Sequence, residues 1–206
     1  MKYRRIVFEL FLVVFLLMST STLLWSGEPG DLIKKIVLKD ISLKEGEDLE
    51  ERKQELWIEI SNSLDFEEIA KRVMGKYWKE RSSEEKKEFI GLFINNVKGA
   101  CMRKTGPRFG EEIISLGEKQ NNRYARVHIG LLKRTVEEVS ADFRLIKKDG
   151  QWKICDLIYQ GVSLVYNYRS QVYSFLAKSS YEELVKELKQ RQHKEKDISI
   201  NSSHPS

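Results

Sequence analysis

The hydrophobic period of this chain changes near residue 110, and that change limits the folds open to it. The apolar residues of "SEEKKEFIGLFINNVKGACMRK" (83–104) recur every three or four positions, which is typical of a helix with one buried face. After the break "TGPRFG", the segments 123–132 and 136–148 alternate apolar and polar residues, as half-buried strands do. Helices, then strands, then helices predict an α+β domain.

Helix-capping and turn motifs in the sequence predict where the individual elements begin and end. Capping boxes at Asp65–Glu68 and Ser82–Glu85 each open a helix, and Asp149-Gly150 is a hairpin turn. Expected helices cover residues 31–43, 49–62, 66–74, 83–104, 162–178 and 181–191. Expected strands cover residues 111–116, 123–132, 136–148 and 152–159, which together form a four-stranded antiparallel sheet packed with several helices.

The first 26 residues predict a secretory signal peptide. A basic start, "MKYRR", precedes an apolar run from Ile6 to Met18 that only Glu9 interrupts, and small residues follow. Cleavage after Ser26 is expected, with Ser21 as the alternative, and an uncleaved anchor stays open. Either way the domain, residues 27–191, would lie outside the cytoplasm. Residues 192–206 are polar and are expected to be disordered.

Composition excludes several classes of function. The chain is 41% hydrophobic and 33% charged, as expected for a globular protein, and its net charge of +5 comes from interleaved acids and bases. No basic stripe of the kind that binds nucleic acid is present. Cys101 and Cys155 could form one disulfide in an exported chain, but their apolar flanks favour unpaired, packed thiols. Two cysteines without a neighbouring histidine do not make a metal site, and no cofactor is predicted.

Catalytic residues are hard to find. His193 and His204 lie in the tail, and His128 is expected on the exposed face of a strand. Ser163 precedes a helix without the second glycine of a nucleophile elbow, so it is expected to cap that helix. Asp156 stands in an apolar strand and needs a partner, for which Arg169 or Lys153 is available. An enzyme is therefore not expected.

Two stretches carry a family resemblance. "LDFEEIAKRVMGKYWKERSSEEKKEFIGLF" contains an Asp-Phe pair and a Gly-x-x-Trp, and "DGQWKICDLIYQGVSLVYNYRSQVYSFL" contains W-K-x-x-D, G-V-S-L-V and N-Y-R-S-Q. Over residues 33–188 the chain resembles the MlaC family of periplasmic phospholipid-binding proteins, also called toluene-tolerance auxiliary components of an ABC transporter. Met74, Cys155 and Ala100-Cys101 depart from the family's usual residues, and two of these changes make a large side chain small.

The resemblance implies a monomeric carrier that moves phospholipid between an outer-membrane lipoprotein complex and an inner-membrane ABC transporter complex with a lipid-binding ring. Such a carrier would maintain outer-membrane lipid asymmetry and hold acyl chains in an apolar cavity between helices and sheet. Periodicity alone cannot distinguish a cavity wall from a packed core, because both require the same residues. The expected wall residues are Phe89, Phe93, Val97, Val127, Ile129, Val139, Phe143, Ile154, Val165 and Val172.

Two other functions remain open at this point. The chain could be a lipid-free adaptor that binds an envelope transporter through its surface. It could also be an NTF2-like enzyme with a cone-shaped pocket, for which Asp156 is the sole visible acid–base candidate.

Overall fold

The computed structural model describes residues 28–44, 46, 48–106, 111–132 and 138–202. The predicted signal peptide lies outside these residues. Among these residues, six α-helices and one 3-10 helix account for most of the amino-terminal and carboxy-terminal parts, and strands lie between them. The helices are α2 (Pro29–Ile41), α3 (Leu49–Ser63), α4 (Phe66–Met74), α5 (Ser83–Lys104), α6 (Leu164–Leu176) and α7 (Tyr181–Ser202), and the 3-10 helix is η1 (Gly75–Glu80).

The strands form an antiparallel sheet in the order β1-β2-β3-β4-β5. Their bounds are β1 (Glu112–Gln120), β2 (Tyr124–Leu132), β3 (Glu138–Lys148), β4 (Gln151–Tyr159) and β5 (Val162–Ser163). The predicted count of four strands is wrong by one. Gln160 and Gly161 both have positive φ, as do Asp149 and Gly150, so each pair makes a two-residue hairpin. The second hairpin returns the chain for two residues before α6 begins at Leu164 rather than at the predicted Val162.

Strand β1 extends to Gln120, past its predicted end at Leu116. Its last residues, Gly117 to Gln120, are polar and exposed, so they lack the alternation that reveals a half-buried strand. They nevertheless pair with β2 in continuous register. Backbone pairing along an edge strand therefore continues where the side-chain pattern has ended.

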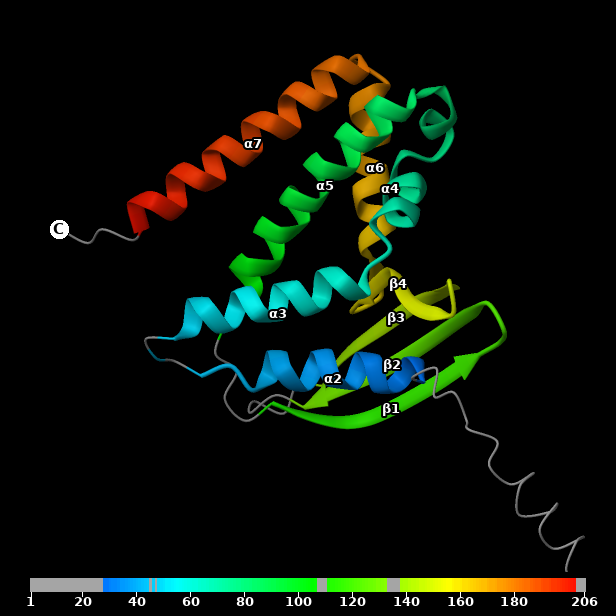
Figure 1. Cartoon of the computed structure of the whole chain (residues 1–206), viewed down its shortest axis with the longest axis vertical. Helices are drawn as coiled ribbons and strands as arrows, with labels where there is room; N and C mark the ends of the chain where they lie inside the picture. Colours follow the sequence, from blue (N-terminus) through cyan, green and yellow to red (C-terminus); the bar gives the residue numbers. More distant parts are fainter. Residues whose placement is uncertain (1–27, 45, 47, 107–110, 133–137, 203–206) are drawn as a thin grey trace, which may run out of the picture.

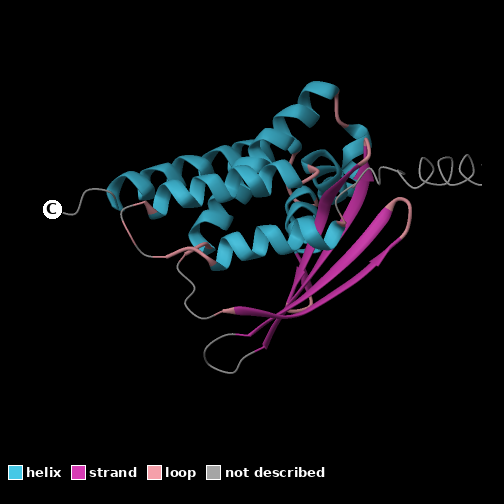
Figure 2. Cartoon of the chain, turned by 60° about the horizontal axis from the view of Figure 1, so that its bottom comes forward, coloured by secondary structure: helices cyan, strands magenta, loops and turns pink. Residues whose placement is uncertain are grey.

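The helices cover one face of the sheet and leave the other open (Figure 2). Along β2, Ala125, Val127, Ile129 and Leu131 point toward α2 and are buried, whereas Arg126 and His128 point away from it. Helix α2 lies along the sheet with α3 beside it, and α4 to α7 form a second group next to them (Figure 1). The period-two pattern of the strand thus determines which face meets the helices.

Side-chain caps fix where the helices begin. Ser82 and Glu85 form the predicted capping box, with both hydrogen bonds present. At α4 the box is incomplete. Asp65 accepts from the Glu68 amide at 3.0 Å, but the Glu68 carboxylate binds Arg72 at 2.7 Å instead of returning to the helix start. The sequence pattern S/T/D-x-x-E therefore predicted the cap at both helices and the reciprocal bond at one.

Helix α7 continues past its predicted end at Arg191 to Ser202. The backbone of residues 192–202 is helical, so the helix is longer than the sequence pattern predicted. Glycine and proline are absent from residues 182–203, and no breaker therefore stops a helix that has already formed. Residues 203–206 of the predicted tail lie outside the described part of the chain.

Candidate functional site

The apolar side chains of the described residues form two clusters. The first, here called the helical cluster, is built from α4, α5, α6 and α7. Its buried members are Ile69, Ala70, Val73, Met74, Phe89, Leu92, Phe93, Val172, Tyr181, Leu184 and Val185. The second, here called the sheet cluster, lies between α2 and the covered face of the sheet. Its buried members are Ile33, Ile36, Ala125, Val127, Ile129, Leu131, Leu145, Trp152 and Ile154.

Five of the ten predicted wall residues belong to the helical cluster. Phe89, Phe93 and Val172 are buried in it, while Val97 and Val165 are half-buried and pack against it. The rings of Phe89 and Phe93 stack with their centroids 6.0 Å apart, and Phe93 meets the edge of Tyr168 at 5.2 Å. The periodic stripe of α5 therefore faces the other helices.

Four more belong to the sheet cluster. Val127, Ile129 and Ile154 are buried there, and Phe143 is half-buried at its margin. The tenth, Val139, is buried in β3 directly opposite Leu131 of β2. The structure thus divides the predicted set into two groups. One group packs among helices α4 to α7, and the other lies on the sheet face that α2 covers.

One segment joins the two clusters. Leu64, between α3 and α4, packs against both. It forms an isolated bridge with Ile154, and the Asp65 amide donates to the Ile154 carbonyl at 2.9 Å. Residues 64 and 65 therefore tie the helical cluster to the sheet cluster.

The predicted wall omits most of the buried cluster residues. Met74 of α4 and Ile33 of α2, for example, are both 0% exposed, and Ile36 of α2 is 6% exposed. Each lies on an apolar helical face that the sequence displays, so the signal existed. Hydrophobic periodicity does not say which helix packs against which cluster.

Asp156 is held in a structural network. It is buried in β4 and accepts from Ser163 Oγ at 2.8 Å, from the Val165 amide at 3.2 Å and from Arg144 at 3.4 Å. Neither predicted partner is used, because Lys153 donates instead to the Asn62 carbonyl and Arg169 lies beside Gly75 and Tyr173. Arg144 is the neighbour of Asp156 across the β3–β4 ladder, a pairing that only register reveals.

A comparison with protein-family models decides the family. The model described as "MlaC protein" matches residues 34–190, well over half of the chain. The chain belongs to the MlaC family.

Solved structures agree with this at the level of the fold. A phospholipid-binding protein of Ralstonia solanacearum, in complex with a phospholipid, is 19% identical to this MlaC-family chain, with a TM-score of 0.64. The match covers 82% of this chain and 99% of that one. A protein of Campylobacter jejuni described as an NTF2-like transpeptidase is 18% identical over 62% of this chain and 97% of its own, but its TM-score of 0.37 supports no inference. No curated protein shows significant similarity to the chain.

The remaining titratable groups of this MlaC-family chain suit structure rather than chemistry. No disulfide joins Cys101 and Cys155, as predicted, and burial raises the pKa of the Cys155 thiol. Ser163 caps α6 by accepting from the Tyr166 amide, also as predicted. His128 is 44% exposed and contacts Asp142 at 3.2 Å, and the neighbouring Arg126 guanidinium lowers the pKa of Asp142.

Within the described ranges, no group of three or more His, Cys, Asp or Glu residues could hold a metal ion. None of the helices in those ranges is both long enough and apolar enough to span a bilayer.

Proposed function

We propose that this chain is a periplasmic carrier that binds the acyl chains of a phospholipid between its helices and its sheet. The observation that carries the proposal is the family match over residues 34–190. Its fold is shared with a protein that was solved with a phospholipid bound. The predicted signal peptide, residues 1–26, supports export. Among the described residues we identify no buried acid–base pair that would favour a catalytic function instead.

The energetics of lipid transfer explain why such a carrier needs an apolar interior and no catalytic group. Each methylene prefers an apolar environment to water by about 0.8 kcal/mol. Two acyl chains of common length together exceed on the order of 20 kcal/mol, so a lipid does not cross an aqueous gap unaided at a useful rate. A carrier whose interior is nearly as apolar as a bilayer keeps loading and unloading close to balance.

The side chains best placed to contact acyl chains are the half-buried members of the predicted wall. Val97, Phe143 and Val165 each pack against a cluster and still retain free apolar surface. The fully buried members, such as Val127 and Phe89, would instead support the wall from behind. The cavity itself is part of the proposal.

The proposed carrier works between two membrane complexes. It would exchange lipid with an inner-membrane ABC transporter complex that has a lipid-binding ring and with an outer-membrane lipoprotein complex, as a monomer. The result would be the maintenance of outer-membrane lipid asymmetry. A cavity has no direction, so the direction of transfer would be set by these partners and their energy source.

Mass spectrometry of co-purified lipid tests the proposal. The mature protein is expressed in a Gram-negative host, purified without detergent and extracted with organic solvent. We expect close to one phospholipid per protein, and none from an unrelated periplasmic protein purified in parallel. Absence of phospholipid, together with transporter binding that ignores lipid, would favour the adaptor function instead.

Overpacking the covered face of the sheet should reduce lipid occupancy. Val139 is 1% exposed, so Val139→Trp places a large ring between sheet and helices at a cost of about 1–3 kcal/mol in stability. We expect occupancy to fall severalfold while the circular dichroism spectrum is kept. Leu132→Trp is the matched control, because Leu132 is 38% exposed at the end of β2. Equal occupancy in both variants would remove Val139 from the wall.

A further inference from the structure

The open face of the sheet carries three cations in a row. Lys119 of β1 pairs in register with Arg126 of β2, which pairs with Arg144 of β3. Residues directly opposite on adjacent strands point to the same face, so the three side chains lie next to one another. This face is turned away from α2, and the Arg126 and Arg144 side chains are 59% and 53% exposed. Like charges in such a row repel one another, so a stable row needs counter-charges.

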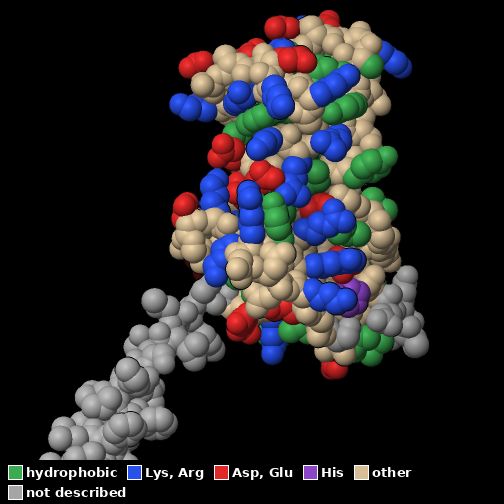
Figure 3. Space-filling view, turned by 90° about the vertical axis from the view of Figure 1, so that its right-hand side faces the viewer, with side chains coloured by type: hydrophobic (Ala, Val, Ile, Leu, Met, Phe, Trp, Pro, Cys, Tyr) green, Lys and Arg blue, Asp and Glu red, His purple; other side chains and the backbone are tan. Residues whose placement is uncertain are grey.

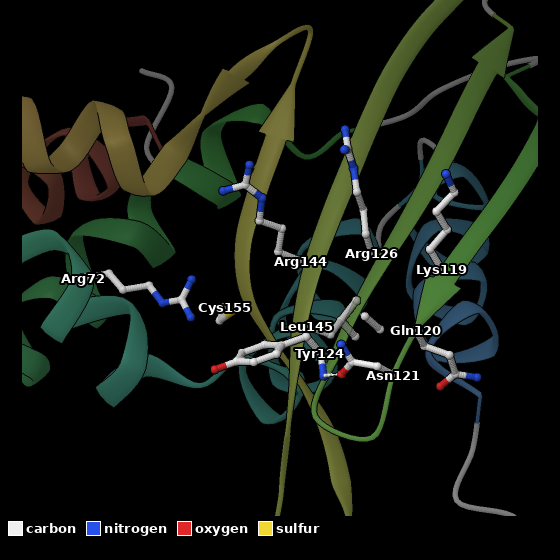
Figure 4. A pocket seen from close by; sticks show the side chains of 10 residues that line it. Arg72, Lys119, Gln120, Asn121, Tyr124, Arg126, Arg144, Leu145 and Cys155 are labelled. Carbon is white, nitrogen blue, oxygen red and sulfur yellow. Dashed lines mark hydrogen bonds between the residues drawn. The ribbon is translucent and has the colours of Figure 1, made fainter.

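Beside this row lies a pocket of about 420 Å³ (Figure 4). A fourth cation, Arg72 of α4, approaches it from the side opposite Lys119, with Cys155 next to it. The lining residues are Arg72, Lys119, Gln120, Asn121, Tyr124, Ala125, Arg126, Arg144, Leu145 and Cys155. Among the described residues, the lining contains four cationic side chains and no carboxylate. A space-filling view from the side shows Lys and Arg outnumbering Asp and Glu over the middle of that surface (Figure 3).

Carboxylates next to the lining residues hold the arginines in place. Asp142 accepts from Arg126 Nε and Nη2, both at 3.0 Å, Glu68 accepts from Arg72 Nε at 2.7 Å, and Asp156 accepts from Arg144 Nη1 at 3.4 Å. Each guanidinium has five N–H donors, so at least three remain on every arginine. These counter-charges allow four cations to converge and fix their orientation before any ligand arrives.

Lys119 differs from the arginines. No carboxylate is paired with its ammonium group among the residues that the structure describes. Its three N–H donors and its full charge are therefore available to a ligand.

We propose that this pocket binds a phosphate group, carried by a lipid headgroup or free in solution. A phosphate offers several acceptor oxygens, and the planar fork of a guanidinium binds two of them at once. The pocket is much larger than the roughly 30 Å³ of a water molecule, which leaves room for the group esterified to the phosphate against the ring of Tyr124. Lys119, Arg126 and Arg144 lie on the face of the sheet opposite the sheet cluster, so a phosphate bound to them does not compete with the proposed acyl chains.

The first arm of the test uses inorganic phosphate with the full mature protein. Amide NMR shifts are followed during titration at constant ionic strength, and we expect changes at residues 119–126, 144 and 72. Lys119→Gln/Arg126→Gln should weaken binding about tenfold or more, because each loss removes charge-assisted hydrogen bonds. Lys34→Gln/Arg52→Gln is the charge-matched control on α2 and α3, outside the pocket, and should bind as the wild type does.

The second arm uses vesicles of phosphatidylcholine with and without phosphatidylglycerol. Cosedimentation that needs the anionic lipid and is lost in the Lys119→Gln/Arg126→Gln variant identifies a membrane headgroup as the ligand. Binding of inorganic phosphate with the same loss, and no cosedimentation, identifies a free phosphate compound.

Two results would overturn the proposal. One is no response to either ligand, and the other is equal weakening in the pocket and control variants. Lys119→Gln alone guards against misfolding, because it disturbs no ion pair among the described residues. The co-purified lipid content of all variants should equal that of the wild type, so a failure of the carrier proposal and a failure of this one are measured separately.

Discussion

At the scale of single residues, Asp156 shows how a buried carboxylate can serve the fold. Its oxygens accept from the Val165 amide at the start of α6 and from Ser163, whose own Oγ accepts from the Tyr166 amide. The carboxylate therefore satisfies donors at a helix start, which also favours negative charge. Arg144 adds an ion pair across the strands. Strand β4 and helix α6 are joined through this one side chain.

Asp156→Ala should destabilise the protein by about 2 kcal/mol, because it leaves the half-buried Val165 amide and Ser163 hydroxyl without their acceptor. Asp156→Asn keeps one acceptor oxygen and should cost about half as much. Urea unfolding measures both. If Asp156→Ala unfolds within 0.5 kcal/mol of wild type, the network has no structural importance, and a role in turnover would have to be reconsidered.

Tyr181 provides a pH-dependent term. Burial raises its pKa to about 12, and its hydroxyl donates to the Glu85 carbonyl at 2.8 Å. Above pH 10 the unfolded chain loses the phenol proton while the folded chain keeps it. The unfolded state then binds fewer protons, and stability falls as pH rises.

Wild type should therefore lose about 2 kcal/mol more than Tyr181→Phe between pH 9.5 and pH 12, because only the wild type has this phenol to ionise. Denaturant unfolding at several pH values measures the difference. The other tyrosines and lysines titrate in both proteins and cancel in the comparison. Parallel pH curves for the two proteins would contradict the burial of a neutral phenol.

At the scale of elements, the end of α4 depends on one glycine. Gly75 has φ of 54°, in the left-handed region that side chains rarely adopt. A Cβ there would lie 2.2 Å from Tyr173 Oη, and that same oxygen accepts from the Lys76 amide at 3.0 Å. Both the backbone conformation and the close approach of α6 therefore require glycine at this position.

Gly75→Ala should destabilise the protein by about 1–3 kcal/mol through backbone strain and displacement of Tyr173. Gly75→Ala/Tyr173→Phe should recover part of the loss, because the clashing oxygen is removed. Gly91→Ala is the control: Gly91 lies on the exposed face of α5 with nothing within 4 Å of its Cβ position, and the change should stabilise by up to about 1 kcal/mol. Thermal unfolding measures all three, and equal effects at Gly75 and Gly91 would refute the contact argument.

At the scale of the whole molecule, two apolar clusters meet around Leu64, which packs against both. A ligand that lies along this junction would contact both clusters at once and tie the helices to the sheet. The proposed acyl chains are apolar, as both clusters are. Bound lipid should therefore contribute to the stability of the whole domain and not of one part alone.

Removal of lipid should lower the melting temperature by several degrees, because a ligand that binds the folded state alone stabilises it by mass action. The delipidated protein is obtained by solvent extraction and refolding, and readdition of phospholipid should restore the loss. Calorimetry measures the change, with the Val139→Trp variant as a protein of reduced occupancy. Identical melting of loaded and delipidated protein would mean that the lipid is not held inside the fold.

The sequence by itself determined the type and order of the elements. The change of period near residue 110 predicted helices, then strands, then helices, and side chains such as Ser82 and Ser163 predicted where helices begin. These signals are local, since a cap needs three residues and a half-buried strand needs a few alternations. The sequence did not predict the two-residue strand β5 or the polar end of β1, because no side-chain pattern accompanies their backbone pairing.

Only the tertiary structure decided which surfaces meet. The ten predicted wall residues were chosen as one set, and the fold divides them between helices and sheet, because periodicity says that a face is buried and not what it is buried against. Asp156 pairs with Arg144 because strand register places them opposite each other. Lys153 is nearer in the sequence and Arg169 carries the same charge, but neither is placed opposite Asp156. The basic pocket likewise needs Arg72 and Lys119 brought together across four elements. Contacts between residues distant in the chain depend on the register and packing of whole elements, which no local pattern encodes.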